Sequence, residues 1–178
     1  LLNDDALLKQ VSILAERCTA ALRAGGKIIF CGNGGSFADA QHLSAEFTSR
    51  FLFDRPGLPS LALGTNSSAM TAIGNDYGYE NWISKTVEFY LTKNDILILV
   101  SCSGESKNLI NAIKMARKKK IRKIVTFTGC KKNNTLSRMA DLSFWVNLNS
   151  YNIIENIHQF YLLSLVDMII GKSEYPPN

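Results

Sequence analysis

The sequence predicts a single α/β domain in which helices cover both faces of a parallel sheet. Short apolar, β-branched runs alternate along the chain with longer segments of helical periodicity. The strand candidates are apolar on both faces, as is typical of parallel strands buried between two helical layers. The 178 residues suffice for one ordinary domain, and no internal repeat or linker divides them. We therefore expect one doubly wound domain over residues 1–178.

The alternation places each element in order. A leading helix is expected at 4–24, where apolar residues recur at helical spacing until two glycines end it. Five buried strands are expected at 27–31, 60–63, 96–100, 123–127 and 142–146. Helices are expected at 37–52, capped by Ser36, after 64–66, and at 79–91, 106–119, 134–140 and 151–171. The chain thus divides into a leading helix (1–25), an α/β core (26–148) and a C-terminal helix (151–171).

The C-terminal helix is expected to be apolar on almost every side. Such a helix has to be covered all round, and a domain this small has little chain left to cover it. We expect the cover to come from another subunit, which makes the protein an obligate oligomer.

Composition narrows the classes of partner. The formal charge of +5 favours an anionic substrate but is too small to indicate nucleic acid. The basic stretch 117–123 lacks interleaved aromatic residues and is typical of a solvated helix end. No stretch is expected to span a membrane. Four cysteines, at 18, 31, 102 and 130, form no Cys-x-x-Cys pair, so we expect free thiols and a cytoplasmic protein.

Two turns have the composition of phosphate-binding loops. The first expected strand ends in Cys31-Gly-Asn33-Gly34-Gly35-Ser36 and the third in Ser101-Cys102-Ser103-Gly-Glu-Ser106, each opening a helix. Glycines allow close backbone approach, and helix N-termini offer free N–H groups to a phosphate. Either turn alone is also explained as a tight strand-to-helix turn with a cap. Because both lie at the carboxyl edge of the sheet, together they favour a phosphate monoester site.

Polar side chains near the first turn suit proton chemistry. His42 and Glu46 stand four residues apart on one helix face and can converge on a metal ion or a substrate. A simple intrahelical hydrogen bond is the alternative. Asn75-Asp76 either binds sugar hydroxyls or forms a plain turn. Glu155 is a costly carboxylate in an apolar helix unless it is paired or ligates metal, and His158 reads as a core or interface histidine.

The stretch from Cys31 to Glu46, Cys-Gly-Asn-Gly-Gly-Ser-Phe-Ala-Asp-Ala-Gln-His-Leu-Ser-Ala-Glu, closely resembles the phosphoheptose isomerases of the sugar isomerase (SIS) domain superfamily. Support continues through Arg50, Arg55-Pro56-Gly57, residues 73–78 and the serine turn at 101–106. The resemblance implies a five-stranded parallel sheet of flavodoxin-like order and a homotetramer with active sites between subunits. It also implies conversion of sedoheptulose 7-phosphate to D-glycero-D-manno-heptose 7-phosphate, for bacterial surface heptose.

The resemblance also assigns residue roles. It implies that substrate contacts come from Asn33, Gly34, Gly35, Ser36, Glu46, Asn75, Asp76, Ser101, Cys102, Ser103, Ser106 and Glu155. His42 and Glu46 match zinc-ligand positions, and Glu46 matches the catalytic base. The family's second zinc-binding histidine, also its acid, is replaced by Leu163, and a ligating glutamine is replaced by Glu155. We hypothesise that Glu155 completes a His42–Glu46–Glu155 metal site.

These replacements leave a second interpretation open. The chain resembles an enzyme in keeping Glu46, yet Leu163 removes a proton donor. The alternative is a catalytically silent SIS-domain protein that binds a phosphosugar or a protein partner, as the replication-initiator-associating relative does. A regulatory module that senses phosphate is a third interpretation.

Overall fold

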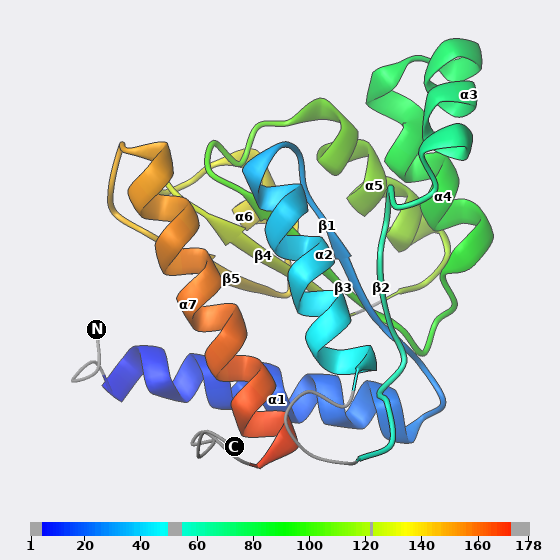
Figure 1. Cartoon of the computed structure of the whole chain (residues 1–178). Coiled ribbons are helices and arrows are strands. Elements are labelled where there is room, and N and C mark those ends of the chain that lie inside the picture. Colours follow the sequence, from blue (N-terminus) through cyan, green and yellow to red (C-terminus); the bar gives the residue numbers. More distant parts are fainter. Residues whose placement is uncertain (1–4, 50–54, 122, 172–178) are drawn as a thin grey trace.

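The structure is a computed structural model that describes residues 5–49, 55–121 and 123–171. Its elements are α1 (Asp5–Arg23), β1 (Ile28–Cys31), α2 (Gly35–Thr48), β2 (Ser60–Ala62), α3 (Ser67–Tyr77), η1 (Tyr79–Asn81), α4 (Trp82–Tyr90), β3 (Ile96–Ser101), α5 (Lys107–Lys118), β4 (Ile124–Thr128), α6 (Thr135–Met139), β5 (Leu142–Trp145) and α7 (Tyr151–Ile170). All strand pairs are parallel, in the order β2-β1-β3-β4-β5 (Figure 1). The predicted fold class and strand order are therefore confirmed.

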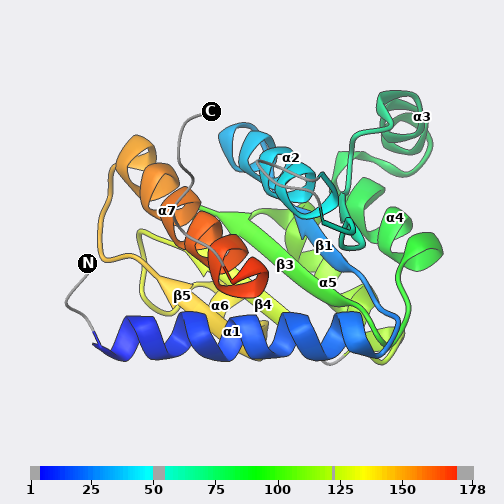
Figure 2. The same cartoon turned by 60° about the horizontal axis from the view of Figure 1, so that its bottom comes forward.

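The strands are buried on both faces, as their composition predicts. Along β1, Ile28 and Phe30 belong to the core beneath α1, α2 and α7. Ile29 and Cys31 point the other way, into the core shared with α4, α5 and α6. Because successive side chains of a strand alternate between faces, one short apolar run supplies both cores. The two layers of helices are visible on opposite faces of the sheet in Figures 1 and 2.

Two details of the expected elements change. Ser36 does not cap the second helix, because α2 already begins at Gly35 and Ser36 is buried in its first turn. Gly34 precedes the helix at φ 55° and makes no side-chain cap. Residues 79–91 are helical as expected, but a 3₁₀ turn and α4 share them. The expected helix end at 50–52, and Arg50 with it, lies outside the described residues.

Helix α7 packs along the sheet beside α1 and α2 (Figure 2). Its buried side includes Ile154, Leu162 and Leu165, whereas Ile153, Phe160 and Met168 are each about half exposed in the single chain. Among the described helices, α7 alone is long and apolar enough to cross a membrane, contrary to the expectation from sequence. Its packing against the sheet gives that composition another explanation, since core helices of globular domains are equally apolar.

Candidate functional site

The candidate site lies at the carboxyl edge of the sheet, where β1 and β3 are neighbours. The turn after β1 runs into α2, which covers one face, and the turn after β3 leads to α5, which covers the other. Ligands of open α/β sheets bind where neighbouring crossovers leave in opposite directions. The two glycine-bearing turns predicted from sequence therefore flank the switch point of this sheet.

Both turns require their glycines. Gly34 has φ 55°, a left-handed value that most residues avoid. A Cβ on Gly35 would lie 2.6 Å from a carboxylate oxygen of Glu155. In the second turn Gly104 has φ 66°, and a Cβ there would lie 2.1 Å from Asn134. The backbone of both turns is thus left bare toward the edge of the sheet, where N–H groups can meet an anion.

The structure brings most of the predicted phosphate-binding side chains to one polar cavity of about 200 Å³. Its lining is Asn33, Ser36, Val100, Ser101, Cys102, Ser103, Ser106, Tyr151 and Glu155. The oxygen of Ser101 accepts from the N–H of Gly104, and that of Ser103 accepts from the N–H of Glu105. These bonds shape the turn and leave each hydroxyl hydrogen to donate to a ligand.

Asn33 is held by residues that sequence reasoning missed. Its side-chain oxygen accepts from Nδ2 of Asn108 at 2.7 Å and from the hydroxyl of Tyr79 at 3.0 Å. Its own Nδ2 donates back to Asn108. Asn108 is buried in the first turn of α5, so these bonds tie the first turn to the helix that follows the second. The sequence at the start of α5 gave no indication that Asn108 bonds to Asn33.

Asn75 and Asp76 are not brought into the cavity. They lie exposed at the end of α3, where Nδ2 of Asn75 donates to Asp76 at 3.0 Å. Tyr79, three residues further on, reaches Asn33 and so anchors this segment beside the first turn. The predicted contact of Asn75 and Asp76 with substrate stays a prediction.

His42 and Glu46 meet as expected on one face of α2. Nε2 of His42 lies 3.1 Å from Oε1 of Glu46, and their side chains are 44% and 13% exposed. The carboxyl group is thus largely covered, whereas the ring has a solvent side. Arg55 donates to the backbone carbonyl of Glu46 and fixes the end of the helix beneath it. On the facing helix, Nε2 of Gln159 lies 3.2 Å from Nδ1 of His42.

Asp39 is a further acidic group that sequence reasoning overlooked. It lies three residues before His42 on α2 and lines a shallow hollow between α2 and α7 together with Glu155 and Gln159. Its Oδ2 atom is buried without a hydrogen-bond partner. Burial first, and the carboxylate of Glu155 second, raise the pKa of Asp39 to about 6, while His42 opposes the shift. Its helical spacing from His42 was the signal that could have identified it.

Burial shifts the pKa values of two other groups, Cys102 and His158, so that both are uncharged at neutral pH. Burial raises the pKa of Cys102 to about 11, and Glu155 adds to the rise, so Cys102 is a neutral thiol at neutral pH. His158 is fully buried beside the carbonyl of Thr128, and burial lowers its pKa to about 4. It is a neutral core histidine, in line with the interpretation from sequence.

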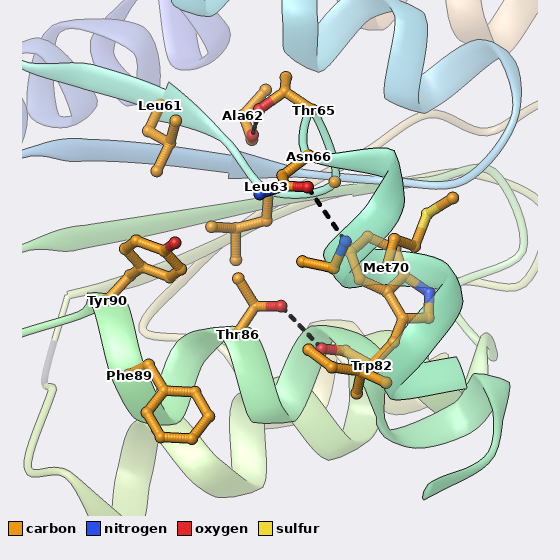
Figure 3. A pocket seen from close by; sticks show the side chains of 13 residues that line it. Leu61, Ala62, Leu63, Thr65, Asn66, Met70, Trp82, Thr86, Phe89 and Tyr90 are labelled. Carbon is orange, nitrogen blue, oxygen red and sulfur yellow. Dashed lines mark hydrogen bonds between the residues drawn. The ribbon is translucent and has the colours of Figure 1, made fainter. Parts of the chain in front are cut away.

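A second, largely apolar pocket lies between β2, α3 and α4 (Figure 3). Its walls include Leu61, Met70, Trp82 and Phe89. In the part of the chain that the structure describes, none of the predicted site residues lines it, and no carboxylate, imidazole or amine does so either. It does not suit a phosphate, so the polar cavity remains the candidate substrate site.

The side chains predicted to hold a metal ion do not converge within one chain. Within residues 5–49, 55–121 and 123–171, no three His, Cys, Asp or Glu side chains lie close enough to hold an ion. His42 and Glu46 are together, but Glu155 lies against Gly35, nearer the first turn. Two donors from one chain do not make a zinc site, which takes three or four. Zinc therefore stays a prediction.

Comparison with known proteins identifies the family that this domain matches. The SIS domain model matches residues 4–129. A phosphoheptose isomerase of Burkholderia pseudomallei is 47% identical over 142 residues, which cover 80% of this chain and 71% of that protein.

Two solved structures agree in fold. A phosphoheptose isomerase from Francisella tularensis superposes with a TM-score of 0.88 at 30% identity, covering 94% of this chain and 88% of the other. Phosphoheptose isomerase GmhA from Neisseria gonorrhoeae gives a TM-score of 0.85 at 34% identity, covering 93% and 87%.

Proposed function

Since this chain belongs to the phosphoheptose isomerase family of SIS-domain proteins and is an aldose–ketose isomerase of sugar phosphates, we propose a seven-carbon substrate for it. The substrate is sedoheptulose 7-phosphate and the product D-glycero-D-manno-heptose 7-phosphate, a precursor of bacterial surface heptose. The four cysteines are free thiols, which supports a cytoplasmic location for this step.

The phosphate occupies the polar cavity between the two turns. Hydroxyls of Ser101, Ser103 and Ser106 and the amide of Asn33 line that cavity, and α2 and α5 begin beside it. Helix N-termini stabilise anions through their free N–H groups and dipole. The lining of the cavity formed by the described residues consists of hydroxyl, amide, thiol and carboxyl groups beside Val100, so these residues hold the phosphate through hydrogen bonds.

The observation that carries the choice of substrate is that the cavity and the proposed base lie at opposite ends of α2, since Ser36 lines the cavity and Glu46 stands near the end of the helix. Ten residues separate Ser36 from Glu46 on α2, which corresponds to ~15 Å of helix. The carbonyl of a 7-phosphate ketose lies at the far end of the carbon chain from its phosphate. An extended seven-carbon sugar phosphate, met by a side chain at each end, can bridge this separation, whereas a triose phosphate is too short.

Between these ends runs a row of polar side chains that we call the α2–α7 seam: Asp39, His42 and Glu46 on α2, and Glu155 and Gln159 on α7. The seam begins at the cavity, since Glu155 lines both the cavity and the hollow beside Asp39. It offers hydrogen-bond partners to the hydroxyls of an extended sugar. The oxygen-rich lining suits a polyol better than an apolar ligand.

Glu46 is the base of the reaction. It removes a proton from C1 of the ketose, and the electron pair left behind forms the C1–C2 double bond of an enediol as the oxygen on C2 takes up a proton. Return of a proton to C2, with loss of the hydroxyl proton on C1, gives the aldose. A carboxylate positioned against the reacting carbons is suited to carry this proton between them.

Asp39 supplies the proton for the oxygen on C2. With its pKa raised to about 6, Asp39 still holds a proton in part of the molecules near neutral pH. This gives a role to an acid in a chain where Leu163 stands at the position of the family's histidine. Environment-tuned carboxyls commonly divide acid and base roles in this way.

The assembly is a homotetramer with sites between subunits. Ile153, Phe160 and Met168 of α7 are about half exposed in the single chain, and a second subunit would cover them. The number of four copies is the expectation that the family resemblance implies.

The test is to incubate the purified protein with sedoheptulose 7-phosphate, with and without added zinc, and to follow aldose formation. We expect turnover that Glu46→Gln abolishes, because the amide cannot accept the C1 proton. Glu16→Gln, an equal change at an exposed position of α1, should leave turnover intact. No turnover of this sugar or of a panel of sugar phosphates, despite binding, would instead support the catalytically silent interpretation.

A further inference from the structure

We propose that Asn108 and Tyr79 are positioning residues that orient the side-chain amide of Asn33 so that it donates a hydrogen bond to the bound phosphate. The inference rests on the proposed function, because a phosphate occupies the polar cavity only in that proposal. It adds two residues, one on α5 and one in η1, that neither the glycine and serine motifs nor the resemblance identified.

Asn33 is placed where its amide can contact a phosphate. It follows β1 in the first turn, and its side chain lines the polar cavity together with the hydroxyls of the second turn. An amide can stabilise a phosphate dianion only through its nitrogen, because the amide oxygen accepts hydrogen bonds and repels an anion. The orientation of this amide therefore decides whether Asn33 favours or opposes phosphate binding.

The orientation of the Asn108 amide is fixed by the backbone of its own helix. Asn108 is only 3% exposed in the first turn of α5. The backbone nitrogen of Leu109 lies 3.0 Å from Oδ1 of Asn108 and also donates to the carbonyl of Ser106. A backbone N–H can only donate, so the Asn108 atom that meets it has to be the oxygen. The nitrogen of the Asn108 amide is thereby left to donate toward the first turn.

This fixed amide sets the orientation of Asn33. Nδ2 of Asn108 donates to Oδ1 of Asn33 at 2.7 Å, and Nδ2 of Asn33 donates back at 3.1 Å. The hydroxyl of Tyr79 donates to the same Oδ1 of Asn33 at 3.0 Å. Two donors thus occupy both lone pairs of this oxygen. If the Asn33 amide were turned over, nitrogen would meet nitrogen and oxygen would meet oxygen, and both bonds with Asn108 would be lost.

One hydrogen of the Asn33 amide is left for a ligand. Nδ2 of Asn33 carries two hydrogens, and within the described parts of the chain Asn108 is the partner that accepts one of them. The other hydrogen belongs to a side chain that lines the cavity and is only partly buried. An anion entering the cavity meets a donor that is oriented before it binds, so binding requires little further ordering of this side chain.

The position of the phosphate predicts which kinetic constant responds. The phosphate lies far from the reacting carbons, so it is held alike in the bound substrate and in the transition state. Loss of a donor to such a group raises KM and leaves kcat nearly unchanged. A hydrogen bond to a charged group contributes about tenfold to affinity. Substitutions that disturb the Asn33 amide should therefore weaken binding without slowing the bound enzyme.

The experiment is a double-mutant cycle between Asn33 and Asn108, measured by the dissociation constant of inorganic phosphate and by KM for sedoheptulose 7-phosphate. We expect Asn33→Ala to weaken phosphate binding about tenfold and Asn108→Leu about fivefold, with kcat within about twofold in each. In the Asn33→Ala background, Asn108→Leu should have no further effect, because Asn108 acts through Asn33. A merely structural role of Asn108 would weaken binding equally in both backgrounds.

Two further variants complete the design. Tyr79 is exposed, so Tyr79→Phe leaves the fold intact even if Asn108→Leu unfolds the protein, and loss of one donor should weaken phosphate binding about threefold. Asn94→Leu is the matched control. Its amide donates to the carbonyl of Ala24 before β3 begins, at the opposite edge of the sheet, so this variant should bind phosphate like the parent protein.

Three results would overturn the inference: phosphate binding that Asn33→Ala leaves unchanged, phosphate binding that neither Asn108→Leu nor Tyr79→Phe weakens, or an Asn108→Leu effect that persists without Asn33. Failure of the parent protein to bind either inorganic phosphate or sedoheptulose 7-phosphate would instead refute the proposed function.

Discussion

Replacing Asp39 with asparagine should stabilise the folded protein at neutral pH and have almost no effect near pH 4. In the folded state Oδ2 of Asp39 is buried without a partner, and Glu155 lies close by. Ionising this carboxyl therefore costs free energy that the unfolded chain does not pay. Asparagine is close to isosteric and carries no charge at any pH, so it avoids the cost.

The magnitude follows from the pKa of Asp39. Its value rises from 3.8 to about 6 in the folded protein. At ~1.4 kcal/mol per unit this sets an upper bound of ~3 kcal/mol. Because the carboxyl is only half-buried, solvent screening reduces the effect, and we expect ~1 kcal/mol. Below pH 3.8 both states are protonated and the cost vanishes. It grows as the pH rises through 3.8 to 6 and is complete above about pH 7.

The assay is urea unfolding of the parent protein and Asp39→Asn at several pH values between 4 and 8. The difference between their free energies of unfolding reports on Asp39 together with the charges coupled to it, while the uncoupled groups contribute equally to both proteins. Glu16→Gln, at an exposed position of α1, is the control for loss of a carboxylate. A difference that stays constant from pH 4 to 8 would refute the argument, because an unperturbed carboxyl contributes no such pH dependence.

Three further substitutions probe the seam and the turns. Glu155→Gln removes the second-largest cause of the raised pKa of Asp39, so the pH dependence just described should move to lower pH; an unmoved profile would show that the two carboxyls are not coupled. Gly104→Ala should lower the free energy of unfolding by more than the ~1–2 kcal/mol typical of a left-handed non-glycine residue, because the added Cβ also clashes with Asn134. Gly25→Ala is the control: Gly25 has φ 73° and open space around it, so urea unfolding should show only the ~1–2 kcal/mol loss. Leu163→His should raise kcat if a missing acid limits the rate, and an equal kcat by direct assay would exclude that limit.

The place of residue 163 on α7 explains why the Leu163→His substitution tests the site. Residues 155, 159, 163 and 167 are spaced by four and so share one face of the helix. Gln159 reaches His42, and the pKa of Asp167 is raised by its own burial and then by Glu46. Leu163 lies between these two on the same face, so an imidazole introduced there would face the His42–Glu46 pair.

Much of the site was predictable because its signals are local. The two turns could be recognised since glycines, serines and an adjoining helix lie within six residues of one another, and the strand order β2-β1-β3-β4-β5 brings the ends of β1 and β3 together. His42 and Glu46 were predictable because helical spacing alone sets their distance. The cap assigned to Ser36 was wrong, since the backbone at Gly34 lets α2 begin earlier than the side-chain pattern suggests.

The remaining contacts join residues far apart in the chain, and no local pattern encodes them. Asp39 reads as an ordinary exposed helix residue until α7 places Glu155 beside it and buries one oxygen. Gln159 and His42 are 117 positions apart, and Asn33 and Asn108 are 75 apart.

The sequence by itself determined the fold class, the two turns and the His42–Glu46 pair, because periodicity, glycine content and helical spacing act over a few residues. The strand order was implied by the family resemblance. Only the tertiary structure decided which carboxyls share an environment, which amide holds the His42 ring, and that Glu155 lies nearer the first turn than Glu46. Those features depend on how α2 and α7 pack against the same face of the sheet, and side-chain burial and charge coupling exist only once that packing has formed.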